Sequence, residues 1–111
     1  MKEIETFKEL INEELYYEAH EALEEQWFPI RQIKNDCCLV LKGFINAAVS
    51  LELYKRDKIE QSKKIYLVYL KYVTQNRIIK TNNQHIFIEL KEFLDKKFNE
   101  REIDTILYNK K

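Results

Sequence analysis

The fold is decided by residues 36–55, which read DCCLVLKGFINAAVSLELYK. Written as a helix, this stretch has apolar side chains around most of its circumference: Cys37, Val40, Leu41, Phe44, Ile45, Ala48, Val49, Leu51 and Leu53. Because a helix that is apolar on nearly every side is buried, the stretch predicts the central helix of a bundle. One side of it carries Gly43, Ala47 and Ser50, whose small side chains predict the close approach of another helix.

Amphipathic helices are predicted on both sides of this stretch, because the apolar residues recur with a period of 3.6. One begins near Thr6, which forms a capping-box spacing with Glu9, and a second ends around residue 28 because Pro29 follows. Two more are expected over about residues 58–75 and from about residue 86, after a polar turn at 80–84. Asn99 with Glu102 predicts a last short helix.

The sequence therefore predicts an all-α fold, a compact bundle of about five helices plus a short C-terminal helix. One domain is expected over residues 1–111, since the chain is too short for a second core. The residues expected to be largely buried are Leu23, Trp27, Leu41, Phe44, Ile45, Ala48, Tyr66 and Leu70.

Composition limits the function. The 19 basic and 19 acidic side chains balance, so no excess positive charge indicates a nucleic acid or an anionic membrane as partner. No signal-peptide core and no apolar run of the ~20 residues needed to span a bilayer is evident. Cys37 and Cys38 are adjacent and read as small apolar residues in a reducing compartment. A cytoplasmic protein is expected.

A histidine and a carboxylate interrupt the apolar stripe of the second predicted helix. At 100° per residue, one face of that helix carries Glu13, Tyr16, His20, Leu23, Glu24 and Trp27. A carboxylate on a core-facing stripe must be paired, protonated or bound to a metal, because burying it alone costs too much free energy. Glu52 is a second carboxylate that points close to the inward direction of the central helix.

Three segments together resemble the DUF309 family: residues 10–12, residues 16–27 with their Glu-Ala-His-Glu step, and residues 43–48. The resemblance covers about residues 7–73. It implies a compact helical bundle and a family of unestablished biochemical role, sometimes described as a predicted metal-dependent hydrolase. Two features depart from the family pattern. Glu14 stands where a turn glycine is usual, and Lys42 and Asn46 stand where glutamines are usual. The first departure predicts a differently shaped or continuous junction between the first two helices.

The first functional hypothesis is a divalent-metal-dependent hydrolase. His20 and Glu24 are one helical turn apart and could hold a metal ion such as Zn²⁺, with Glu21 as the general base. A third ligand would come from Glu52 or His85. Zinc sites in enzymes normally have three protein ligands and an open position, so this hypothesis needs that third side chain.

The alternatives need no metal. In a purely structural reading, His20 and Glu24 belong to a hydrogen-bonded network and the indole N–H of Trp27 has a partner. In that case the chain is a helical module that binds a protein partner. A third hypothesis is a small-molecule pocket between the second and third helices, for which His20, Glu24, Glu52, Tyr16, Trp27 and Gly43 are the candidate residues. A homo-oligomer is compatible with all three hypotheses.

Overall fold

The chain folds into an all-α bundle, as the sequence predicts. The computed structural model describes residues 2–101, and no strand occurs among them. The elements are α1 (Lys2–Asn12), α2 (Tyr16–Trp27), a short 3-10 helix η1 (Phe28–Ile30), α3 (Asp36–Lys55), α4 (Ile59–Tyr72), α5 (Gln75–Ile78) and α6 (Gln84–Glu100). The last short helix predicted from Asn99 onward lies almost entirely outside the described residues.

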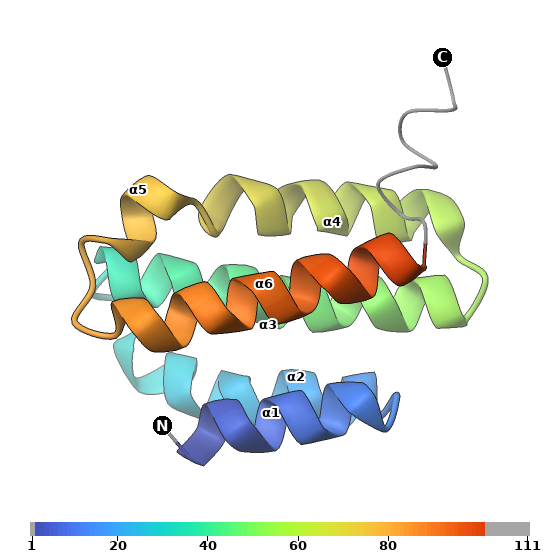
Figure 1. The fold of residues 1–111 in the computed structure, drawn as a ribbon, viewed down its shortest axis with the longest axis horizontal. Helices are drawn as coiled ribbons and strands as arrows, with labels where there is room; N and C mark the ends of the chain where they lie inside the picture. Colours follow the sequence, from blue (N-terminus) through green and yellow to red (C-terminus); the bar gives the residue numbers. More distant parts are fainter. Residues whose placement is uncertain (1, 102–111) are drawn as a thin grey trace.

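The central position of α3 is confirmed. In Figure 1, α1 and α2 lie along one edge of the bundle, α4 and α5 along the opposite edge, and α3 and α6 between them. Successive long helices pack against each other, α1 on α2, α2 on α3 and α3 on α4. By length and composition α3 could cross a membrane, contrary to the expectation that no segment could, and just over half of its apolar stretch is buried inside the bundle.

The core is formed by side chains from every long helix. Six of the eight residues predicted to be buried are buried: Leu23, Leu41, Phe44, Ile45, Ala48 and Tyr66. The predictions for the other two were wrong. Trp27 is only partly buried, and the side chain of Leu70 is 37% exposed because the inward face of α4 is centred on Ser62, Tyr66 and Tyr69.

The small residues of α3 allow α4 to lie against it. A Cβ atom placed on Gly43 would lie 2.4 Å from Cγ2 of Val73 and 3.0 Å from Cβ of Tyr72, so no larger residue fits without movement. Further along, the hydroxyl of Ser50 donates to the carbonyl of Ser62, and the hydroxyl of Ser62 donates to the carbonyl of Ser50, each at 2.8 Å. These reciprocal bonds satisfy two hydroxyl groups that are fully buried.

One prediction about helix ends was wrong, and one of the two alternatives for the junction between α1 and α2 is excluded. Helix α1 begins at Lys2, so Thr6 lies inside it and does not cap it. The junction between α1 and α2 is a turn at which Glu14 has a φ of 60°, not a continuous helix. The amide of Glu14 donates to the carbonyl of Ile11, and the amide of Leu15 to that of Leu10, which is the Schellman pattern. Glu14 therefore adopts the left-handed conformation that glycine usually takes at this position of a helix end.

The C-terminus of α3 ends in the same way. Asp57 has a φ of 63°, its amide donates to the carbonyl of Tyr54, and the amide of Lys58 donates to the carbonyl of Leu53. This turn lies close to the α1–α2 turn: Nζ of Lys55, the last residue of α3, donates to the carbonyl oxygen of Glu14 at 3.0 Å. Two strained turns therefore meet at one end of the bundle.

Candidate functional site

His20 and Glu24 are bonded to each other at the edge of the buried face of α2. The centre of that face is formed by Tyr16, Ala19 and Leu23, which are fully buried. Nε2 of His20 lies 2.9 Å from a carboxylate oxygen of Glu24. The side chain of His20 is 20% exposed and that of Glu24 is 47% exposed. The prediction of an inward-facing Glu24 was wrong, because one residue beyond Leu23 is a rotation of 100°, which takes it to the surface.

The second inward carboxylate of the sequence, Glu52, lies on the wall between α2 and α3. Its carboxylate accepts a hydrogen bond from Nε of Arg56, one turn further along α3, at 2.6 Å. The Glu52 side chain is 22% exposed, whereas that of Arg56 is 61% exposed. Arg56 thus bonds to Glu52 from the solvent side and leaves the carboxylate partly enclosed by protein.

A cavity of about 270 Å³ lies where these two helices meet. Its lining residues are Tyr16, Tyr17, His20, Val49, Glu52, Leu53 and Arg56. The lining combines aliphatic side chains and aromatic rings with a few polar groups, as small-molecule sites do. Helix α2 contributes its first two turns and α3 its last two, so the cavity lies near the end of the bundle that holds the two left-handed turns.

Tyr16, His20 and Glu52 were predicted to belong to the candidate site, and all three line this cavity. Gly43 faces α4 instead of α2, so it is not part of the cavity. Trp27 and Glu24 do not line it either. Tyr17, Val49, Leu53 and Arg56 were missed. Their positions follow from the heptad-like spacing along α2 and α3, but only once the pairing of these helices is known.

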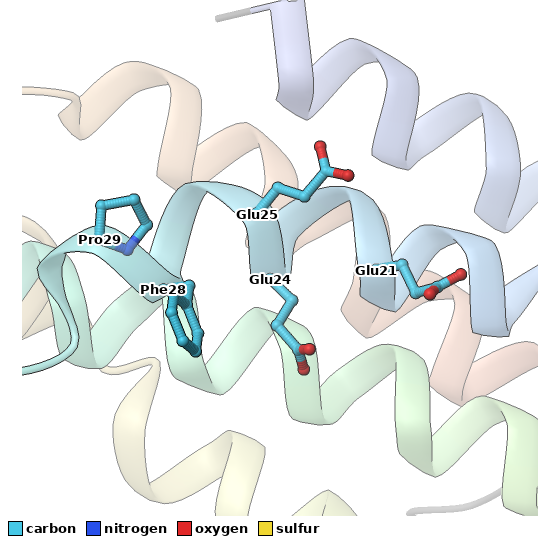
Figure 2. A pocket seen from close by; sticks show the side chains of 5 residues that line it. All are labelled: Glu21, Glu24, Glu25, Phe28 and Pro29. Atoms are coloured by element: carbon cyan, nitrogen blue, oxygen red, sulfur yellow. The ribbon is translucent and has the colours of Figure 1, made fainter.

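Glu21, the predicted general base, lies with Glu24 and Glu25 around a more open hollow of about 360 Å³. Phe28 and Pro29 complete its lining. Figure 2 shows the three carboxylates pointing in different directions from α2. Among residues 2–101, no three or more His, Cys, Asp or Glu side chains gather where they could hold a metal ion. The metal-dependent hydrolase stays a prediction, for which Glu52 would first have to leave Arg56.

The indole N–H of Trp27 contradicts the expected network. Its Nε1 atom is buried and has no hydrogen-bond partner within the described part of the chain. The Trp27 side chain packs against the edge of the core. Glu24 lies one helical turn before it, but the Glu24 carboxylate bonds to His20 and not to Trp27. The network around His20 is therefore a single local pair and does not extend to Trp27.

Tyr16 connects the cavity to the end of α6. Its hydroxyl accepts a hydrogen bond from Arg101 at 2.6 Å, and the same guanidinium lies 3.3 Å from the Glu14 carboxylate. Burial raises the pKa of Tyr16 above its usual 10.0, and the positive charge of Arg101 opposes that rise. Tyr16 is thus held as a neutral phenol that forms one wall of the cavity.

A comparison with family models gives one match, described as "Domain of unknown function (DUF309)", over residues 4–65. Every residue that lines the cavity lies within that range. No curated protein and no solved structure matches the chain. The matched part runs from α1 into the first half of α4 and leaves out α5 and α6.

Proposed function

This chain belongs to the DUF309 family, and we propose that it is a small-molecule-binding protein whose site is the cavity between α2 and α3. The proposed ligand is a small organic cation, an amine with an apolar body. The observation that carries the proposal is the partly enclosed Glu52 carboxylate beside Val49 and Leu53. The carboxylate can bind a positively charged group of the ligand, and the aliphatic side chains can pack against its apolar body.

A cation fits the site better than an anion because of the difference in exposure between Glu52 and Arg56. Arg56 is the exposed partner of this pair, and a ligand ammonium that replaces it keeps the Glu52 carboxylate paired. The displaced guanidinium moves into water. A ligand carboxylate would instead have to take Arg56 from Glu52 and leave a partly enclosed carboxylate without its partner, which costs more.

The remaining walls agree with this choice. Tyr17 also lines the cavity and is 55% exposed, and an aromatic face attracts an ammonium group by about 0.5–1 kcal/mol at partly exposed sites. The Tyr16 ring is buried and already lies beside Lys55 and Arg101, so it contributes shape only. The volume of about 270 Å³ limits the ligand to a single ring or a short chain, since the pockets of drug-sized ligands measure roughly 300–1,000 Å³. Phenethylamine meets both requirements and is a suitable probe.

The test is isothermal titration of the protein with phenethylamine, phenylacetate and 2-phenylethanol, which differ in charge and share the same ring. We expect phenethylamine to bind at least about tenfold more tightly than phenylacetate, a difference of about 1.4 kcal/mol. Glu52→Gln should weaken amine binding about tenfold or more. Arg56→Gln should leave amine binding unchanged or strengthen it, because the competing cation is gone.

Glu89→Gln on the exposed surface of α6 is the matched control, since it removes one carboxylate far along the chain from the cavity. It should leave amine binding unchanged. Tighter binding of phenylacetate than of phenethylamine would contradict the proposal, and so would amine binding that is equal in the wild type and Glu52→Gln. Circular dichroism of each variant checks that the helical fold is retained.

A further inference from the structure

The net charge of the chain is zero, but its acidic and basic side chains are concentrated in different helices. Residues 2–27 contain nine acidic and two basic side chains, whereas residues 58–80 contain six basic side chains and one acidic one. The first range covers α1 and α2, and the second covers α4, α5 and the residues that flank them. These elements lie along opposite edges of the bundle (Figure 1). One edge is therefore acidic and the other basic.

The basic edge exposes apolar side chains between its lysines. On α4, Leu67 is 52% exposed, and it lies one turn from both Lys64 and Lys71, which are also exposed. Leu70 on the same helix is also exposed. An apolar centre with a charged rim is the usual composition of a surface that binds another protein.

The acidic edge has the complementary composition. The hollow lined by Glu21, Glu24 and Glu25 is bordered by Phe28, whose side chain is 55% exposed, and by Pro29 (Figure 2). The Arg31 guanidinium lies over the Phe28 ring, 3.6 Å from its centre, but the three carboxylates outnumber this one positive charge. The hollow thus combines a net negative charge with an apolar wall, whereas the α4 surface combines positive charge with leucines. Two copies of the same edge would repel each other, so the two different edges are the pair that attracts.

From this complementarity we propose that the α4 surface of one copy of the protein docks on the α2 surface of a second copy. The contact is head-to-tail, so each copy in a chain of molecules uses both edges and the assembly grows with concentration. Exposed charges are largely screened beyond a Debye length of about 10 Å at 0.1 M salt, so the association should weaken as salt is added. This inference does not depend on what the cavity between α2 and α3 binds.

Sedimentation velocity of the full chain over a range of protein concentrations tests the proposal. In about 20 mM NaCl the average mass should rise above the monomer mass of 13.6 kDa as concentration increases. In about 500 mM NaCl it should return toward the monomer value, with an apparent affinity at least about tenfold weaker. A protein that stays monomeric at low salt, or associates equally at both salt concentrations, would overturn the proposal.

Two double variants then assign the surfaces. Lys64→Gln with Lys71→Gln weakens the basic surface, and Glu21→Gln with Glu25→Gln weakens the acidic one. Each variant alone should associate less than the wild type. An equal mixture of the two should form dimers that do not grow further, because one intact surface of each kind is present per pair.

Lys96→Gln with Glu100→Gln is the control, because both residues are exposed on α6, away from the two charged edges. It should associate as the wild type does. If either surface variant associates as strongly as the wild type while the helical fold is retained, the assigned surface is wrong. If the mixture stays monomeric, the two surfaces do not bind each other.

Discussion

At the scale of single residues, His20 and Glu24 show how a polar pair can sit beside a core without belonging to it. The histidine bonds to the carboxylate at 2.9 Å, and almost half of the Glu24 side chain is in contact with solvent. Such a pair stabilises a helix only slightly, because water screens the charges and both side chains lose freedom when they meet. The arrangement favours a local structural role for the pair.

We therefore expect Glu24→Gln to lower the free energy of unfolding by less than about 1 kcal/mol, as is typical of exposed pairs. Urea unfolding followed by circular dichroism measures the change. Elemental analysis of the same samples, prepared without chelator or affinity-column metal, measures bound metal and so tests the metal hypothesis. Stoichiometric metal in the wild type that is lost in Glu24→Gln would show that His20 and Glu24 are ligands.

Tyr69 makes the protein sensitive to high pH. Its ring is fully buried and its hydroxyl donates to Asp95 at 2.7 Å. Burial raises its pKa far above the usual 10.0, and the Asp95 charge and hydrogen bond raise it further. The folded state therefore keeps the phenol neutral at a pH where the unfolded chain ionises. This contribution to stability is present below pH 10 and is lost as the pH rises above it.

Stability should accordingly fall above pH 10, by up to about 1.4 kcal/mol per pH unit for this one group. At neutral pH Tyr69→Phe should be less stable by about 1–3 kcal/mol, because it loses a hydrogen bond to a charged group. Above pH 10 the gap between the two proteins should narrow, since phenylalanine has no proton to lose. Urea midpoints measured from pH 7 to 11 check this, and a constant gap would contradict the assignment.

At the scale of elements, the contact between α3 and α4 depends on Gly43. An alanine normally stabilises the interior of a helix by about 1 kcal/mol relative to glycine. Here the added methyl group would meet Val73 at 2.4 Å and Tyr72 at 3.0 Å, in a position that Ser50 and Ser62 further fix by their buried hydrogen bonds. Overpacking of this kind costs about 1–3 kcal/mol, so it outweighs the gain in helix propensity.

Gly43→Ala should thus lower the free energy of unfolding by up to about 2 kcal/mol, the difference between these two effects. Asn46→Ala on the same helix is a suitable control, because the Asn46 side chain donates to the Lys42 carbonyl of its own helix and is partly exposed. Denaturant unfolding of both variants gives the comparison. A Gly43→Ala protein more stable than the wild type would mean that α4 can move away freely.

The turns that end α1 and α3 are strained, because Glu14 and Asp57 have positive φ angles. This left-handed conformation costs a residue with a side chain about 1–2 kcal/mol relative to glycine. Asp57→Gly should therefore raise the free energy of unfolding by about 0.5–1 kcal/mol. Glu14→Gly should gain less, since it also removes the contact of the Glu14 carboxylate with Arg101. Thermal unfolding of the two variants measures both effects, and equal gains would show that the Arg101 contact adds nothing.

At the scale of the whole molecule, α6 completes the core that the earlier helices leave open. The ring of Phe87 lies 5.7 Å from that of Phe44, and the ring of Phe98 lies 5.2 Å from that of Tyr69, between ring centres. Offset and tilted aromatic pairs of this kind each stabilise a core by about 0.5–1.5 kcal/mol beyond the area they bury. The family match ends at residue 65, so the folded unit extends well past the matched segment.

The sequence predicted what depends on periodicity alone. The bounds of α3 agree with the predicted residues 36–55, and Gly43 does lie where another helix approaches. Glu24 was predicted to face the core, but the 100° rotation from Leu23 takes it to the surface. A continuous helix at Glu14 was one predicted alternative, but Glu14 adopts a left-handed turn that its residue type does not favour. The separation of charge was also missed, because a net count of zero says nothing about which helices carry the charges.

The unpaired indole of Trp27 provides a fluorescent probe at the C-terminal end of α2. It is the only tryptophan in the chain, and its N–H group is buried without a hydrogen-bond partner among the described residues. Indole fluorescence shifts to shorter wavelength when the ring is shielded from water and to longer wavelength when it becomes hydrated. Emission from this single fluorophore therefore reports when α2 separates from the core, without any label.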